Sequence, residues 1–448
     1  MATSTIDTGC SQVIRTIRQI VAAMTAVSTL GLVACGDQGS ATNAAIPDVD
    51  VLAREYVSLE LAMGRHDPAH VDAYFGPKEL VALADQAELS PAQIIEQADA
   101  LVERLEPLLS VREGRPRDRL RGLLARLTAL RTRASMAQGE RLSFDEEARA
   151  LFGVTPPRYE AAHFDALLVD IEALLPGEGP LADRVSGFLK SFEVPAERLD
   201  AVFQAAIGEC RTRTLAALEL PAQERFTLEY VSDKPWSGYN WYQGDSESLI
   251  QVNTDLPQQI NRAVDLGCHE GYPGHHTYQT LQELNLAQGE GWIEYTVQPL
   301  FSPSALLAEG SANYGIRVAF PGEEQVEFER RVLWPLAGLE AGEAERYYAL
   351  QRLRARLSYA RNEAARGYLD GRMTREQAVD WIVRYNLVDL AQAEKSVDFI
   401  ETYRSYVVNY NLGQDLVRDY VERVGGDRWA SFTRLLSVPM IPADLLEP

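Results

Sequence analysis

Apolar residues recur at helical spacing through the first half of the chain. From about residue 49 to residue 220, hydrophobic positions lie three and four residues apart and charged residues occupy the opposite side. Such a stripe predicts amphipathic helices packed around a core. Gly and Pro clusters divide the pattern into separate helices. One clear run consists of Leu120, Leu123, Leu124, Leu127 and Leu130.

Two helix starts can be located from their capping residues. Ser90 precedes Pro91, which is typical of an N-cap followed by proline in the first turn. Ser143 begins a similar segment that reaches Glu146 three residues later. The Arg- and Glu-rich faces of these helices are interpreted as solvated surface rather than binding patches.

The pattern changes between residues 225 and 255. Phe226–Val231 is rich in β-branched and aromatic residues, and the segments 239–242 and 249–253 flank a turn at 243–246. We therefore expect a small antiparallel sheet. Helical spacing returns at Pro257 and continues to the C-terminus.

These patterns predict a mainly α fold. We expect a large two-lobed helical body with a small antiparallel β-sheet beside an active-site helix. The expected domains are a helical N-terminal lobe over 48–220 and a second lobe over 221–448, with the small sheet and the C-terminal helices.

The N-terminus has the pattern of a secretory signal. Arg15 and Arg18 precede an apolar run over 20–34, and the run ends in a Leu-Val-Ala-Cys sequence that resembles a bacterial lipobox. We expect residues 1–34 to be removed, Cys35 to be lipidated and residues 35–47 to form a tether. The alternative is a plain secretory signal followed by a chance cysteine.

Charge and cysteine content narrow the possible partners. The formal net charge of −22 disfavours nucleic acid and anionic membrane surfaces, so we expect membrane contact only through the lipid anchor. Of the four cysteines, Cys210 and Cys268 remain after Cys10 is lost and Cys35 is acylated. They could form one disulfide or stay as buried thiols.

Three of the six histidines lie within eight residues, from His269 to His276. Imidazole nitrogens followed by a carboxylate are what a zinc hydrolase requires: ligands for the metal and a base for the attacking water. Glu270, directly after the first histidine, is the expected general base. Its proton would pass to the leaving amine.

The spacing of these histidines differs from the four-residue spacing of an ordinary zinc-binding helix. His275 follows His269 by six residues and His276 follows it by seven, with Pro273-Gly274 between. A two-residue bulge at the proline would return His275 to the ligand position. We therefore favour His275 as the ligand, and His276 as a catalytic group that supports the ligands or faces the substrate.

Glu309 is the expected third zinc ligand. Apolar residues precede it, small residues follow it, and Asn313 lies one turn later, where it could orient a histidine or the carboxylate. Three other glutamates compete for this role, in more polar surroundings: Glu283, Glu290 and Glu294.

These motifs resemble the domain-of-unknown-function 885 family of bacterial lipoproteins, regarded as candidate zinc metallopeptidases of the gluzincin type. The matching pieces are His269-Glu270, Pro273 to His276, Glu309 to Tyr314 and Tyr410 to Gly413. The resemblance implies a two-lobed helical fold with zinc at the floor of a deep cleft. It also implies a sheet edge that binds peptide backbone.

The resemblance implies further site residues. The hairpin with Tyr239, Trp241 and Tyr242 matches the substrate-binding edge, and Tyr410 matches a tyrosine that stabilises the oxyanion. Tyr410 could equally be a packing residue beside its aromatic neighbours. The family's Pro-Gly-Gln before this tyrosine is replaced by Arg404-Ser405-Tyr406, where Arg404 could bind a substrate carboxylate or form a surface ion pair.

The sequence thus leads to a functional hypothesis. We expect a lipid-anchored zinc metallopeptidase that cleaves small peptides in the bacterial cell envelope. One alternative is a metal-dependent amidase or esterase acting on non-peptide substrates. Another is a catalytically silent binding lipoprotein with a structural metal site.

Overall fold

The structure is a computed structural model and describes residues 48–446. The expected signal peptide, Cys35 and the tether lie outside the described residues. Within the described range the chain is mainly helical with small sheets, which confirms the predicted fold class. In this range no helix combines the length and the hydropathy needed to span a bilayer.

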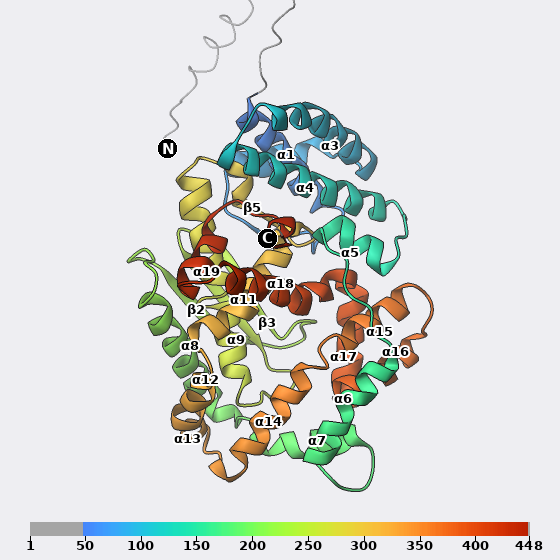
Figure 1. Cartoon of the computed structure of the whole chain (residues 1–448). Coiled ribbons are helices and arrows are strands. Elements are labelled where there is room, and N and C mark those ends of the chain that lie inside the picture. The colour runs from blue at the N-terminus through green and yellow to red at the C-terminus, as the bar shows by residue number, and fades with distance from the viewer. Residues whose placement is uncertain (1–47, 447–448) are drawn as a thin grey trace, which may run out of the picture. The chain divides into compact units, whose positions relative to one another are not determined.

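The first four helices pack around a core of their own (Figure 1). Ser90 caps α3 with a complete capping box and proline in its first turn, and Ser143 caps α5 in the same way, so both predicted helix starts are confirmed. The helices of this half are α1 (Val49–Met63), α2 (Lys78–Ala87), α3 (Pro91–Leu105), α4 (Gly114–Ala137), α5 (Phe144–Phe152), α6 (Ala161–Leu174), α7 (Leu181–Leu189) and α8 (Leu199–Leu215).

A three-stranded sheet follows. Its strands are β2 (Arg225–Val231), β3 (Gly238–Gly244) and β4 (Glu247–Asn253), in the order β2-β4-β3. The predicted hairpin β3–β4 is antiparallel, whereas β2 joins β4 in parallel, because the chain crosses over before β3. A second, two-stranded antiparallel sheet pairs β1 (Val71–Tyr74) with β5 (Val297–Pro299).

The remaining helices begin directly after the sheet. They are α9 (Arg262–Glu270), α10 (His275–Gln282), α11 (Pro303–Ala319), α12 (Glu324–Phe328), α13 (Trp334–Ala337), α14 (Ala344–Ala355), α15 (Ala360–Leu369), α16 (Arg375–Asn386), α17 (Leu390–Tyr403), α18 (Val408–Val424), α19 (Arg428–Ser437) and α20 (Pro442–Leu446). Figure 1 shows α9, α11 and α18 gathered near β3, and contacts join α11 to both of the other helices.

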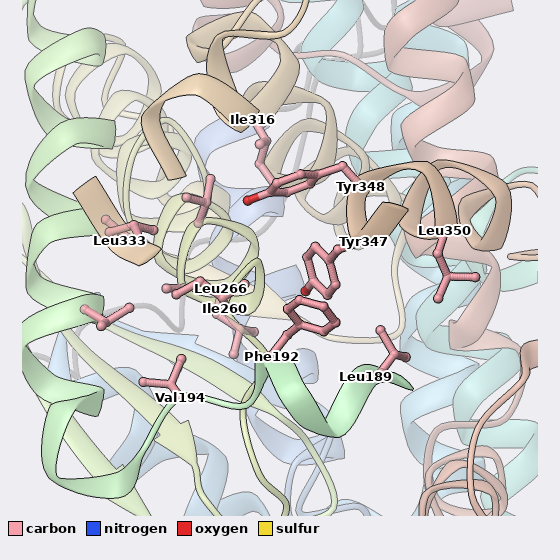
Figure 2. Close-up of a cluster of buried hydrophobic side chains, with 14 of the residues drawn as sticks. Leu189, Phe192, Val194, Ile260, Leu266, Ile316, Leu333, Tyr347, Tyr348 and Leu350 are labelled. Carbon is pink, nitrogen blue, oxygen red and sulfur yellow. The ribbon is translucent and has the colours of Figure 1, made fainter. Parts of the chain in front are cut away.

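Helices α9 and α11 both pack against a cluster of buried aromatic side chains. Figure 2 shows Leu266 of α9 and Ile316 of α11 in the same core as Phe192, Tyr347 and Tyr348. The rings of Phe192 and Tyr347 lie 4.5 Å apart. Members of this core come from both sides of residue 220, so the two halves of the described chain share it. Packed aromatic side chains limit the motion of both helices.

Helices α11 and α18 cross with their main chains in contact. A Cβ atom on Gly310 would lie 2.4 Å from the carbonyl carbon of Gly413, and one on Gly413 would lie 2.8 Å from the carbonyl oxygen of Leu306. Only glycine permits so close a crossing. The crossing fixes Glu309, on α11, against the first turns of α18.

Candidate metal centre

A four-residue break between α9 and α10 sets the spacing of the histidines. Two backbone hydrogen bonds across it span six residues instead of the usual four. The Gly274 N–H donates to the Cys268 carbonyl at 3.0 Å, and the Thr277 N–H donates to the Gly271 carbonyl at 3.3 Å. Two extra residues are thus accommodated along an otherwise helical path, as expected from the Pro-Gly pair.

Gly274 allows the chain to return against the end of α9. A Cβ atom at this position would lie 1.8 Å from the carbonyl oxygen of His269, which no side chain could tolerate. The close approach brings His275 beside His269, and their Nε2 atoms lie 3.1 Å apart. The structure therefore brings His275, and not His276, together with His269.

Glu309 completes a group of three converging donor atoms. Its Oε2 lies 3.2 Å from Nε2 of His269 and 3.7 Å from Nε2 of His275. This oxygen is buried and has no geometrically sound hydrogen bond. A buried carboxylate oxygen without such a bond is costly unless something else binds it.

Neighbouring side chains orient two of these three groups. Asn313 Oδ1 accepts a hydrogen bond from Nδ1 of His269 at 2.9 Å, which leaves Nε2 of that ring with its lone pair. The amide nitrogen of Asn313 donates to the carbonyl of Tyr410 at 2.9 Å. The Tyr406 hydroxyl donates to Oε1 of Glu309 at 2.7 Å and directs Oε2 towards the histidines.

The two carboxyl groups of the site differ in their pKa. Burial acts to raise the pKa of Glu309, but the adjacent His275 and His269 outweigh it and hold this pKa below its usual range. Burial raises the pKa of Glu270 to about 7; His269 opposes this shift and Glu309 reinforces it. Glu309 is therefore a stable anion, whereas Glu270 can exchange a proton near neutral pH.

Either carboxylate could be considered a ligand, since a donor atom of Glu270 also lies close to both histidines. Glu270 Oε1 is 4.0 Å from Nε2 of His269, farther than the oxygen of Glu309. Bonds of about 2 Å in a tetrahedral set place donor atoms about 3.3 Å apart. The separations of 3.1, 3.2 and 3.7 Å among His269, His275 and Glu309 fit that spacing, and the donor types suit zinc.

The three donor residues line a cavity of about 1040 Å³. Tyr239, Tyr410 and Glu270 share this cavity. The ring of Tyr410 stacks near His269 at a centroid distance of 6.3 Å. Burial, with a further contribution from Glu309, holds the pKa of Tyr410 well above its usual value, so its hydroxyl stays protonated. A cavity of this size accommodates a short peptide.

Two of the three aromatic residues assigned to substrate binding lie elsewhere. Tyr239 lines the cavity and donates a hydrogen bond to Asp72. Trp241 lies on the same face of β3 as Tyr239, with the two ring centroids 4.6 Å apart, but it is 43% exposed, donates to Gln251 and does not line the cavity. Tyr242 is buried and donates to Glu283, outside the cavity. The expected role of Trp241 and Tyr242 is corrected accordingly.

His276 does not face the cavity. Its side chain is fully buried; Nδ1 lies 2.7 Å from the Ser248 hydroxyl and Nε2 lies 3.2 Å from Oε2 of Glu224. Because successive residues of a helix point about 100° apart, His276 is directed at the sheet while His275 is directed at the site. The catalytic role expected for His276 is therefore corrected to a structural one.

Arg404 is also displaced from its expected role. Its Nε donates to Oε2 of Glu147 at 2.8 Å, and the carboxylate of Glu147 is fully buried. The arginine thus neutralises a core carboxylate and does not line the cavity. This corrects its assignment to substrate binding.

The competing glutamates are each engaged elsewhere. Glu294 pairs with Arg119 at 2.6 Å and Glu290 with Arg115 at 2.9 Å, while Glu283 accepts from Tyr242. None of the three lines the cavity.

Sequence reasoning missed functional neighbours that come from distant segments. Asp72, on β1, lines the cavity, and burial raises its pKa to about 6. Tyr406 supports Glu309, although from the sequence it was only one member of an aromatic cluster. No spacing motif links either residue to the histidines.

The remaining cysteine pair forms a disulfide. Cys210 of α8 and Cys268 of α9 are bonded, with their Cα atoms 5.6 Å apart. This resolves the alternative left open by the sequence. The bond ties α9, the helix that carries His269, to α8.

The chain matches no family model and no curated protein. Among solved structures it is similar to a protein of Colwellia psychrerythraea described as a candidate lipoprotein, with 15% identity, a TM-score of 0.47 and coverage of 79% of this chain and 71% of that chain. It is also similar to a candidate lipoprotein of unknown function from Shewanella oneidensis, with 14% identity, a TM-score of 0.44 and coverage of 90% and 79%.

Proposed function

We propose that this protein is a zinc-dependent hydrolase, a metallopeptidase that cleaves short peptides. His269, His275 and Glu309 would hold the metal. The observation that carries this proposal is the convergence of two Nε2 atoms on the buried Oε2 of Glu309, which lacks a well-formed hydrogen bond. A divalent cation satisfies all three donors at once.

When bound, zinc supplies Lewis acidity, which polarises a carbonyl group and lowers the pKa of water. Glu270 takes a proton from the attacking water and delivers it to the leaving amine. Its pKa of about 7 suits both transfers at neutral pH. Tyr410 keeps its proton and donates a hydrogen bond to the carbonyl oxygen as negative charge develops there.

The cellular location is part of the same proposal. The lipobox-like sequence ending at Cys35 supports a lipid-anchored protein of the bacterial cell envelope. The disulfide between Cys210 and Cys268 fits an oxidising compartment.

Glu270→Gln tests the proposed chemistry. Zinc-loaded protein is incubated with a mixture of short peptides, and products are identified by mass spectrometry. We expect wild-type turnover and a loss of about 10²- to 10⁴-fold in the variant, because the amide cannot accept the proton. Zinc content, measured by elemental analysis, should stay near one ion per chain.

Glu290→Gln is the matched control, since Glu290 pairs with Arg115 outside the cavity. It should keep full turnover. Undiminished turnover in Glu270→Gln would remove Glu270 from the mechanism. Zinc binding without turnover of any peptide would favour a binding protein, and turnover confined to non-peptide amides or esters would favour the amidase or esterase alternative.

A further inference from the structure

One basic side chain of the cavity has neither an ion-pair partner nor a hydrogen-bond partner in the described part of the chain. Most cationic residues that line the cavity are paired or hydrogen-bonded: Lys395 with Asp255 at 2.6 Å, Arg352 with Glu323 at 3.5 Å, Arg262 with Asp265 at 3.7 Å, Arg354 with Gln351 at 3.2 Å and Arg317 with Gln325 at 3.5 Å. Arg361 alone makes no hydrogen bond or ion pair within residues 48–446, and its Nε is buried without an acceptor.

The guanidinium of Arg361 is nevertheless held in place. Its central carbon lies 4.6 Å from the ring centroid of Phe399, in a cation–π contact. The next residue, Asn362, exchanges two amide hydrogen bonds with Asn411 of α18, at 3.1 and 2.9 Å. This pairing fixes the start of α15 against α18 and places Arg361 near Tyr410, which directly precedes Asn411.

Tyr410 connects this arginine with the metal centre. Arg361, Glu309 and Glu270 all lie close enough to Tyr410 to influence its pKa. Burial also lowers the pKa of Arg361 itself, with only Tyr410 opposing the shift, since the protein places no carboxylate beside it. A buried cation that lacks a counter-ion is costly, and a ligand that brings an anion removes the cost.

We propose that Arg361 binds the free C-terminal carboxylate of the peptide, so that the protein acts as an exopeptidase from the C-terminal end. The assignment rests on the proposed peptidase function and adds its substrate class. Guanidinium and carboxylate groups match in a planar, two-point hydrogen bond. A terminal carboxylate is present on every unmodified peptide, whatever its sequence, and a chain end suits a buried position. The carboxylate-binding role considered for Arg404 thus belongs to Arg361.

Peptide binding tests this inference separately from turnover. The probe is an alanine tetrapeptide with either a free or an amidated C-terminus, titrated by calorimetry into the zinc-loaded Glu270→Gln protein. We expect the free acid to bind about 10- to 100-fold more tightly than the amide. Adding Arg361→Gln should reduce this ratio to near one, and Arg361→Lys should leave an intermediate ratio.

Two further arginines serve as comparisons. Arg356, which is exposed and pairs with Asp170 outside the cavity, is the matched control, and Arg356→Gln should keep the full ratio. Arg354→Gln tests a second buried cavity arginine, which hydrogen-bonds only to a neutral amide, and it should also keep the ratio. Thermal unfolding of each variant checks that the fold is retained.

Several results would overturn the inference. The Glu270→Gln protein would bind the free acid and the amide equally tightly, or would bind neither. Alternatively, the preference for the free acid would survive Arg361→Gln, or Arg354→Gln would abolish it instead. An amidated peptide with a glutamate side chain that binds as tightly as the free acid, in an Arg361-dependent manner, would overturn the terminal assignment. Tighter binding of the free acid than of the amide, without turnover of any peptide, would support Arg361 as the carboxylate site and contradict the proposed hydrolase.

Discussion

His275 and His276 are neighbours in sequence but lie in opposite environments. The Nε2 atom of His275 faces that of His269 and a carboxylate oxygen without a well-formed hydrogen bond, at the wall of a cavity. Both ring nitrogens of His276 have partners, Ser248 and Glu224, in a fully buried position. The residue type is the same at both positions, and His275 is only slightly more exposed, with 15% of its side chain accessible against 0% for His276. The difference is whether the protein itself satisfies every polar atom.

The carboxylates repeat this contrast. Glu224 receives hydrogen bonds from Arg211 and Tyr272 in addition to its contact with His276. Glu309 receives one good hydrogen bond, from Tyr406, and its second oxygen is left to the histidines. A complete hydrogen-bond network indicates a structural role, whereas an incomplete one that opens onto a cavity indicates a missing ligand.

The largest expected effect is the difference between His275→Ala and His276→Ala, because only His275 is a proposed zinc ligand. His275→Ala should weaken zinc binding by more than about 100-fold, because it removes one of three ligands. His276→Ala should retain zinc but lower the free energy of unfolding by about 1–3 kcal/mol, because it leaves buried partners unpaired. Competition with a chelator and denaturant unfolding measure the two effects. Equal loss of zinc in both variants would contradict the contrast.

Tyr406→Phe should reveal how far the support of Glu309 matters. Loss of the hydrogen bond to Oε1 frees the carboxylate to rotate, and we expect zinc affinity to fall about 10- to 100-fold. Tyr403→Phe is the control, since the Tyr403 hydroxyl makes no hydrogen bond within the described residues. If both variants bind zinc equally well, the support is unimportant.

Glu224→Gln should change how the free energy of unfolding depends on pH, which tests the structural role of the Glu224 network. Burial acts to raise the pKa of Glu224, but His276, Tyr272 and Arg211 outweigh it and hold this pKa below its usual value. The folded state therefore binds fewer protons than the unfolded state, and the stabilisation by Glu224 is present above about pH 4.3 and lost as the pH falls below it. Denaturant unfolding at pH 7, 5 and 4 should show a smaller decline in Glu224→Gln. Parallel curves for wild type and variant would contradict this.

The sequence predicted those features that depend on local pattern. The apolar spacing and the capping residues Ser90 and Ser143 located helices, and the Pro-Gly pair predicted the two-residue insertion ahead of His275. Asn313, one turn after Glu309, was expected to support a ligand and does contact His269. Each of these inferences needs only residues within a few turns of one another.

The features that were missed depend on packing between distant segments. Arg361 and Arg404 are both arginines in helical surroundings, and only tertiary structure reveals that Arg404 meets Glu147 while Arg361 meets no anion. The direction of β2 depends likewise on how the chain crosses over before β3, which its own residues do not encode. Trp241 shares its face of β3 with Tyr239, and only the packing around the strand determines that Tyr239 lines the cavity and Trp241 does not.

The glycine crossing of α11 and α18 restricts how the cavity can open. Since the two main chains touch at Gly310 and Gly413, neither helix can slide or rotate without carrying the other. The backbones that carry Glu309, the proposed metal ligand, and Tyr410 therefore move together as one rigid unit. If the cavity widens to admit peptides of different length, the elements that line it opposite α11 and α18 must move.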